Sequence, residues 1–142
     1  MYICGRFDKM NRKTARDLAF KLLYQVDIQK EDGDVIFDIA KDEYNIDDKS
    51  KEYIGNILYG VEENAETIND IISKKSEGWK LNRISKISLA CLRLGIFEIL
   101  YCDDIPDQVA ANEAVGIAKL YEGEESARFV NGILSVIIKE KA

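Results

Sequence analysis

Histidine is absent from the 142 residues of this chain, and proline, cysteine and tryptophan are scarce. The absence of histidine excludes histidine-based catalytic triads, histidine general bases and histidine metal ligands. Because Pro106 is the only proline, long helices meet few interruptions. The three cysteines, Cys4, Cys91 and Cys102, are odd in number and form no CxxC pair, which argues against a disulfide framework or a zinc site and fits a reducing cytosol.

The sequence also lacks a long hydrophobic run, a Gly-rich phosphate loop and a nucleophile motif. A membrane-spanning helix needs about 18 or more uncharged apolar residues, and the basic start MYICGRFDKM has no apolar signal-peptide region. We therefore expect a cytoplasmic protein that is not an enzyme and holds no metal. With 46% apolar and 32% charged residues, the chain suits one ordinary domain or two small subdomains that share a core.

Charge is distributed unevenly along the chain. The net charge of −6 argues against bulk binding of nucleic acid. Residues 1–16, however, carry five basic residues and one acidic residue, a net charge of +4, whereas the remaining 126 residues carry −10. A basic arm on an acidic body is expected where a protein makes a local contact with a polyanion, and a solvated helix start explains the arm equally well.

Apolar residues recur at helical spacing through the first half of the chain. A first helix is expected to begin after Asn11, a good N-cap residue, and a second to span 34–44. The spacing then predicts one long helix over 49–76. The segment 76–79, where a charge run ends at Gly78 and Trp79 follows, is the best candidate boundary between two halves.

The second half is predicted to contain three more helices. The segment 81–101 carries only Arg93 and Glu98 as charges beyond Ile87, so it is expected to lie at the centre or to face a partner protein. Pro106 is expected to open the next helix, and Ser126 to cap the last one after a loop over 122–125.

One stripe of the first helix combines cations with aromatic rings. Lys13, Arg16, Phe20 and Tyr24 follow each other at steps of three and four residues. Such a stripe can meet phosphates and stack on nucleobases. Alternatively, Phe20 and Tyr24 widen the core face of the helix while the cations are solvated, and the residues alone favour this interpretation.

The segment ARFVNGILSVI, residues 127–137, contains an Asn-Gly pair typical of β-hairpin turns. Helical spacing of apolar residues nevertheless continues through Asn131 and Gly132, and no alternating pattern flanks them, so we predict a helix. A glycine inside a helix costs about 1 kcal/mol relative to alanine. We expect close packing against a neighbouring helix to compensate for Gly132.

Two acidic residues lie in apolar helices, Glu98 and Glu113. They are predicted to have a structural role rather than to form an acid/base pair, because a buried carboxylate requires a partner. At least one of them is expected to lie near Arg93.

Four segments resemble, in order and spacing, the signature segments of the NusB family of bacterial transcription antitermination factors: NRKTARDLAFKLLYQVD, LNRISKISLACLRLGIFEILY, IPDQVAANEAVGIAKLY and ARFVNGIL. The resemblance runs from about Met10 to the C-terminus. It implies an all-α fold of about seven helices in two small subdomains, which we place at 10–76 and 77–142. Residues 1–9 lie outside the pattern and are expected to be an N-terminal extension or to follow a misplaced start codon.

The resemblance also implies partners. Members of this family bind boxA-type RNA of ribosomal RNA leaders together with NusE, which is also a small-subunit ribosomal protein, and act on the RNA polymerase elongation complex with other Nus factors. They are monomers or homodimers and use no cofactor. The surface for the partner protein is expected on the second half, around the apolar helix 81–101.

The resemblance places the RNA surface on cations, aromatic rings and one carboxylate. The cations are expected to meet phosphates, the rings to stack on unpaired bases, and the carboxylate to accept a hydrogen bond from a base amino group. Thr14 stands where the family often has another arginine, so this arm is somewhat less basic. The expected RNA-binding residues are Arg12, Lys13, Arg16, Tyr24, Tyr121, Glu125, Arg128 and Phe129.

Two other interpretations stay open. A NusB-like domain also precedes the catalytic domain of some RNA cytosine methyltransferases, so the chain could be a detached RNA-recognition module. It could also be a helical protein-binding scaffold without RNA specificity.

Overall fold

The structure, a computed structural model, describes residues 10–77 and 80–141, which form only helices and their connections. The helices are α1 (Arg12–Gln29), α2 (Gly33–Glu43), α3 (Asp48–Glu63), α4 (Ala65–Lys75), the short 3₁₀ helix η1 (Leu81–Arg83), α5 (Lys86–Tyr101), α6 (Asp107–Glu122) and α7 (Glu124–Lys141). The predicted all-α class is confirmed. The expectations for residues 1–9, Gly78 and Trp79 lie outside the described residues. Within the described ranges, no helix is long and apolar enough to cross a membrane.

Helix α1 begins as its sequence predicts. The side-chain oxygen of Asn11 accepts a hydrogen bond of 2.7 Å from the backbone N–H of Thr14, which satisfies one of the free donors at the helix start. The apolar stripe of α1, which includes Ala15, Ala19 and Leu22, is buried. The helix ends at Gln29, and its C-cap residue Lys30 adopts the left-handed conformation with φ of 55°.

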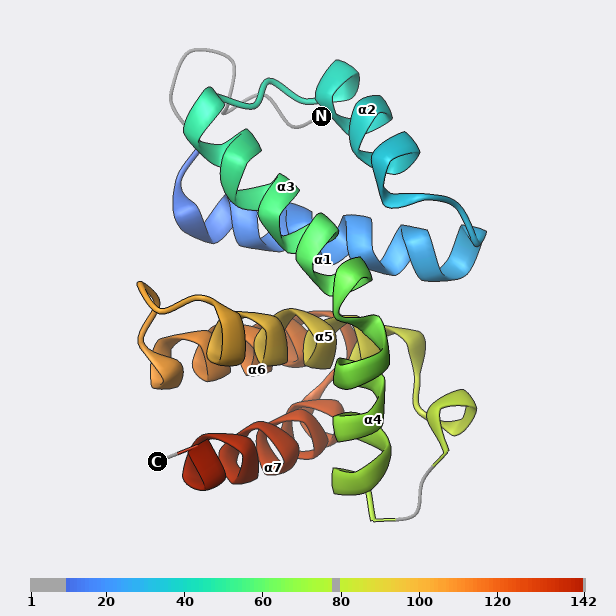
Figure 1. Ribbon diagram of the computed structural model, residues 1–142, viewed down its shortest axis with the longest axis vertical. Helices are drawn as coiled ribbons and strands as arrows, with labels where there is room; N and C mark the ends of the chain where they lie inside the picture. Colours follow the sequence, from blue (N-terminus) through green and yellow to red (C-terminus); the bar gives the residue numbers. More distant parts are fainter. Residues whose placement is uncertain (1–9, 78–79, 142) are drawn as a thin grey trace.

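The helices form two groups, which Figure 1 shows one above the other. The upper group contains α1, α2 and α3, and the lower group contains α4 to α7. Helix α5 belongs to the lower group but also packs against α1 and α3. It therefore forms the joint between the groups, and the two share one hydrophobic core.

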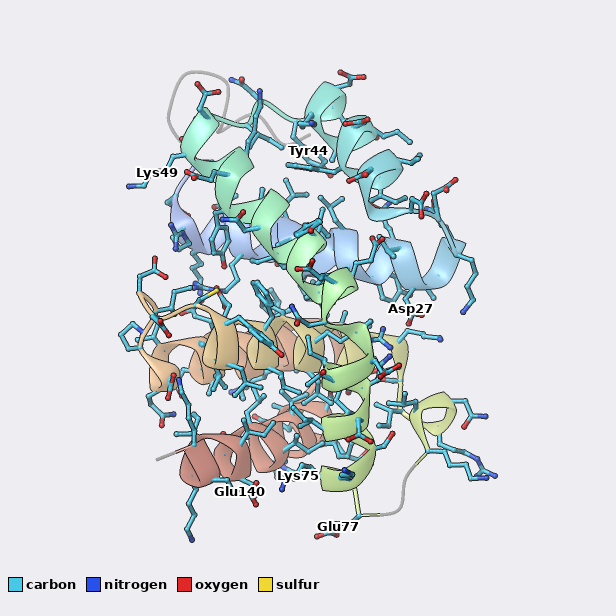
Figure 2. The ribbon with its side chains drawn as sticks, viewed as in Figure 1. Asp27, Tyr44, Lys49, Lys75, Glu77 and Glu140 are labelled. Carbon is cyan, nitrogen blue, oxygen red and sulfur yellow. The ribbon has the colours of Figure 1, made fainter. Side chains whose placement is uncertain are left out.

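The predicted long helix over 49–76 is wrong, because the chain bends at Asn64. Asn64 has φ of −103° and ψ of 19°, and its side-chain amide donates a hydrogen bond of 2.8 Å to the carbonyl of Gly60. The bend sends α4 down along α5 and α7, where Lys75 forms an ion pair of 2.6 Å with Glu140 (Figure 2). In space α4 therefore lies with the second half of the chain, so the change between groups comes at Asn64 rather than at 76–79.

Helix α5 is buried almost all round, which confirms its predicted central position. Leu92, Leu94, Ile96 and Ile99 expose none of their surface. Only its two ends and one narrow side remain accessible. Burial on every side explains why this segment has almost no polar face.

The connections around α6 differ slightly from prediction. Pro106 stands immediately before α6 as its N-cap residue, one position from the predicted place. The predicted loop over 122–125 shortens to Gly123, whose φ of 106° is a conformation that glycine adopts readily. Ser126 does not cap α7, because α7 already begins at Glu124. Ser126 is instead buried, with its Oγ 2.8 Å from the Oγ of Ser88.

The segment 127–137 lies within α7, which confirms the predicted helix. Val130 and Leu134 are completely buried, whereas Asn131 and Gly132 lie on the exposed side. A Cβ added to Gly132 would meet no atom within 4 Å. The expected close packing at Gly132 is therefore wrong, because this residue faces solvent.

Candidate nucleic-acid interface

A buried ion pair joins the start of α1 to the last turn of α5. Arg16 is 4% exposed, and its guanidinium donates to both carboxylate oxygens of Glu98 at 3.0 and 3.2 Å. The Tyr53 hydroxyl of α3 donates to the same carboxylate at 2.6 Å. Burial opposes the charge on Arg16, but its hydrogen bond to Glu98 and the charge of that carboxylate together raise the Arg16 pKa. Burial and the charge of Glu98 raise the Tyr53 pKa as well, so its proton stays on the hydroxyl.

This geometry confirms a structural role for Glu98 but corrects its expected partner. Arg93 does not contact Glu98. Its guanidinium lies 3.4 Å from Asp27, at the end of α1, and donates to Asn69 at 3.2 Å. Glu113 lies 3.8 Å from the Arg16 guanidinium, so Arg16 is the cation near both predicted carboxylates.

The expectation that Arg16 meets a phosphate does not fit its burial, because the guanidinium is occupied by Glu98 inside the protein. Arg12 and Lys13, one turn earlier, are exposed. The Arg12 guanidinium lies 4.1 Å from the centre of the Tyr53 ring, a cation–π contact. The Lys13 side chain is 83% exposed and lies 3.6 Å from Glu113. These two cations are therefore the solvent-accessible charges at the start of α1.

Tyr121, at the end of α6, lies against α1. Its ring stacks on that of Phe20 with centres 5.2 Å apart, and its hydroxyl donates to Asp17 at 2.9 Å. The Lys21 ammonium lies 5.8 Å from the Tyr121 ring and 3.2 Å from Asp17. With 39% of its surface exposed, Tyr121 combines a fixed orientation with an accessible ring.

The two aromatic residues of the α1 stripe differ in exposure. Phe20 is only 3% exposed and belongs to the core, as predicted by the interpretation in which it widens the core face of the helix. Tyr24 is half-buried and packs against the core, with its ring centre 6.5 Å from that of Phe20. The structure therefore leaves only part of the Tyr24 ring available at the surface.

A shallow depression of about 500 Å³ lies where α5, α6 and α7 meet. Glu125 and Phe129 line it together with Arg83 of η1. Beneath them the hydroxyls of Ser85 and Ser88 donate to one oxygen of Glu122, at 2.8 and 3.1 Å. The depression thus offers an aromatic ring, a cation and a carboxylate within one concave surface.

Arg128 is exposed on α7 and is not among the residues that line this depression. It forms no ion pair within the described part of the chain. Its charge is therefore available beside Phe129, its neighbour in sequence.

The structure places Lys13 and Tyr121 along the contact between α1 and α6, and Glu125 and Phe129 in one depression at the start of α7. Contacts of Lys13 with Glu113 and of Tyr121 with Phe20 place α6 beside α1. Lys21 and Arg83 were not predicted. Lys21 follows Lys13 and Asp17 at steps of four, a signal present in the sequence, whereas nothing in the sequence places Arg83 near α7.

The sequence model of the NusB family matches residues 13–139 of the chain. The chain belongs to the NusB family. It is 47% identical over 132 residues to the transcription antitermination protein NusB of Acetivibrio thermocellus, covering 93% of this chain and 91% of that protein. This likeness confirms the resemblance recognised in the signature segments.

Solved NusB structures share the fold. The structure of T. maritima NusB superposes with a TM-score of 0.87 at 41% identity, covering 94% of each chain. A crystal structure of the antitermination factors NusB and NusE in complex with double-stranded RNA superposes with a TM-score of 0.83 at 31% identity, covering 91% of this chain and 96% of that one. The NusB fold thus accounts for nearly the whole chain.

Proposed function

We propose that this protein is a transcription antitermination factor that binds boxA-type RNA of ribosomal RNA leaders together with NusE. The observation that carries the proposal is its likeness, over 91% of the chain, to a NusB that was crystallised with NusE and RNA. The relatives named as antitermination proteins support the same role.

In this proposal the RNA crosses the face formed by α1, α6 and the start of α7. Arg12, Lys13 and Arg128 meet phosphates, because their side chains are exposed and cationic. Tyr121 and Phe129 stack on unpaired bases, as does the accessible part of Tyr24. The exposed carboxylate of Glu125 accepts a hydrogen bond from a base amino group.

Arg16 acts indirectly in this scheme. Held by Glu98, it fixes the first turn of α1, and Tyr53, bonded to the same carboxylate, supports the Arg12 guanidinium on its ring. Lys21 and Arg83 add positive charge to the same face. Holding the cations in place before RNA arrives reduces the conformational entropy lost on binding.

The role requires no catalysis and no cofactor. The protein works in the cytoplasm, as a monomer or homodimer, and joins the RNA polymerase elongation complex with other Nus factors. RNA binding is weak for the protein alone and tighter with NusE, because a joint surface adds contacts without a second loss of rotational freedom.

A charge-reversal experiment tests the RNA surface. Fluorescence anisotropy measures binding of a labelled boxA RNA at several salt concentrations, with NusE present. The double variant Arg12→Glu and Lys13→Glu is expected to weaken binding about tenfold or more and to flatten its dependence on salt, because fewer counterions are released. The control Lys74→Glu and Lys139→Glu makes the same change in net charge on α4 and α7 and is expected to bind normally. Equal weakening by both double variants would refute the proposed surface.

A further inference from the structure

A groove of about 540 Å³ lies between the end of α3 and the end of α5, away from Tyr121 and the α6–α7 depression. Its apolar wall is aromatic. Tyr59 is 65% exposed and Tyr101 is 42% exposed, and the Tyr101 ring stacks on Phe97 with centres 5.6 Å apart. Gly60 makes this arrangement possible, because a Cβ there would overlap the Phe97 ring.

The rest of the groove is acidic. Glu63, Asp103 and Asp104 line it, and among the described residues no basic side chain does. None of the three forms an ion pair with a cation of residues 10–77 or 80–141. The Tyr59 hydroxyl donates to Glu63 at 2.9 Å, which fixes an exposed ring beside a carboxylate. Three uncompensated carboxylates around exposed tyrosines form a surface that favours a cation.

Cations appear beside the groove on this side of the molecule. A neighbouring depression shares Phe97 and Asp104 with the groove and is lined by Arg12 and Lys49 as well as by Glu52. Lys49 points outward from the start of α3 (Figure 2). A phosphate backbone that meets Arg12 is therefore repelled where the carboxylates begin, so the groove does not suit RNA.

Arginine fits the groove better than any other cationic side chain. Its planar guanidinium stacks on aromatic rings and forms paired hydrogen bonds with a carboxylate. The groove offers both kinds of partner, Tyr59 beside Glu63 and Tyr101 beside Asp103. Lysine offers a compact charge without the planar surface.

We propose that this groove docks an arginine-bearing segment of a partner protein, seated on Tyr59 and Tyr101 and paired with Glu63, Asp103 and Asp104. The partner would lie beside the RNA, since Arg12 borders the adjoining depression. The site extends the proposed function by adding a protein contact that depends on no RNA.

An NMR titration of the full chain tests the site. The probe is the peptide acetyl-(Arg-Gly)₃-amide, added to ¹⁵N-labelled protein. The amide signals of Tyr59, Glu63, Tyr101 and Asp103 are expected to shift and saturate. An otherwise identical lysine peptide is expected to bind about threefold or more weakly, because it stacks less well on the rings.

Two variants and a control separate the groove from general acidity. Replacing its three carboxylates (Glu63→Gln, Asp103→Asn, Asp104→Asn) is expected to weaken binding of the arginine peptide about fivefold or more. The control Asp34→Asn, Asp42→Asn and Glu43→Gln, on exposed α2, makes the same change in net charge and is expected to change binding less than twofold. The variant Tyr59→Leu and Tyr101→Leu is expected to abolish the preference for arginine over lysine.

The site would be refuted if the peptide shifted amide signals over other acidic surfaces instead of the groove. It would also be refuted if the carboxylate variant and its control weakened peptide binding equally. A preference for the arginine peptide over the lysine peptide that survives in Tyr59→Leu and Tyr101→Leu would refute it as well. RNA binding measured on the same variants is expected to stay unchanged. Failure of the groove is therefore distinguishable from failure of the RNA-binding proposal.

Discussion

Among single residues, Glu98 is notable because it is a charged side chain inside the core. Its carboxylate is completely buried, and burial of an isolated charge is strongly unfavourable. Two hydrogen bonds from Arg16 and one from Tyr53 satisfy it, and these residues come from α1 and α3 while Glu98 comes from α5. The three bonds therefore fix the position of the basic helix start relative to the core.

Removal of this carboxylate is expected to destabilise the folded protein. The substitution Glu98→Ala should lower the free energy of unfolding by about 3–5 kcal/mol, because it leaves the Arg16 guanidinium buried without its partner. Urea unfolding measures the loss, and the exposed Glu66→Ala on α4 serves as a control with an expected change within about 0.5 kcal/mol. A loss below about 1 kcal/mol in Glu98→Ala would contradict the role assigned to this ion pair.

The chemistry of Cys102 gives a second test at this scale. Burial, together with the charges of Glu98, Asp104 and Asp103, raises the pKa of its thiol to about 11. At pH 8 its thiolate is therefore much rarer than that of an ordinary cysteine, and iodoacetamide should modify it about tenfold or more slowly in the native protein than in urea.

Mass spectrometry of a Cys4→Ser variant measures this rate. The rate is expected to rise with pH until about pH 11, because the pKa is raised and the thiol loses its proton only there. A rate that levels off between pH 8 and pH 9 would show an ordinary thiol.

At the scale of helices, two glycines have opposite surroundings. Gly60 of α3 faces the Phe97 ring, whereas Gly132 of α7 faces open space. The substitution Gly60→Ala should destabilise the protein by about 1–3 kcal/mol through overpacking. Gly132→Ala should stabilise it by about 0.5–1 kcal/mol, because alanine is a better helix former. Thermal unfolding of both variants measures these changes, and a stabilising Gly60→Ala would contradict the packing of α3 on α5.

Helix periodicity predicted most of the elements but not where the chain bends. Val61 and Ile68 keep helical spacing across Asn64, so the apolar pattern contains no signal for the break. The bend depends on the Asn64 side chain and on the packing of α4 against α5 and α7, which are tertiary effects. In the same way, spacing alone cannot distinguish a glycine needed for close packing from one that faces solvent.

For the whole molecule, the family signature predicted the fold, but not the exposure of each candidate site residue. Lys13 and Arg16 are three positions apart on one helix, yet one is exposed and the other buried. The difference arises from Glu98, which lies 82 residues beyond Arg16 in sequence. A single sequence does not encode such a pairing in any local pattern.

The molecule as a whole carries a cationic face on α1 and an acidic aromatic groove beside it. In our account these surfaces serve different partners, RNA and an arginine-bearing protein segment. A protein with net charge −6 needs such local segregation to bind RNA, because its average field repels phosphates.

The central claim, joint binding of RNA and NusE, is tested most directly by size-exclusion chromatography with light scattering. The protein, NusE and a boxA RNA are mixed at moderate salt, and a scrambled RNA of equal length is the control. We predict that protein, NusE and boxA RNA elute together as one complex, and that the scrambled RNA elutes separately. Elution of boxA RNA apart from the two proteins, or equal retention of both RNAs, would contradict the account.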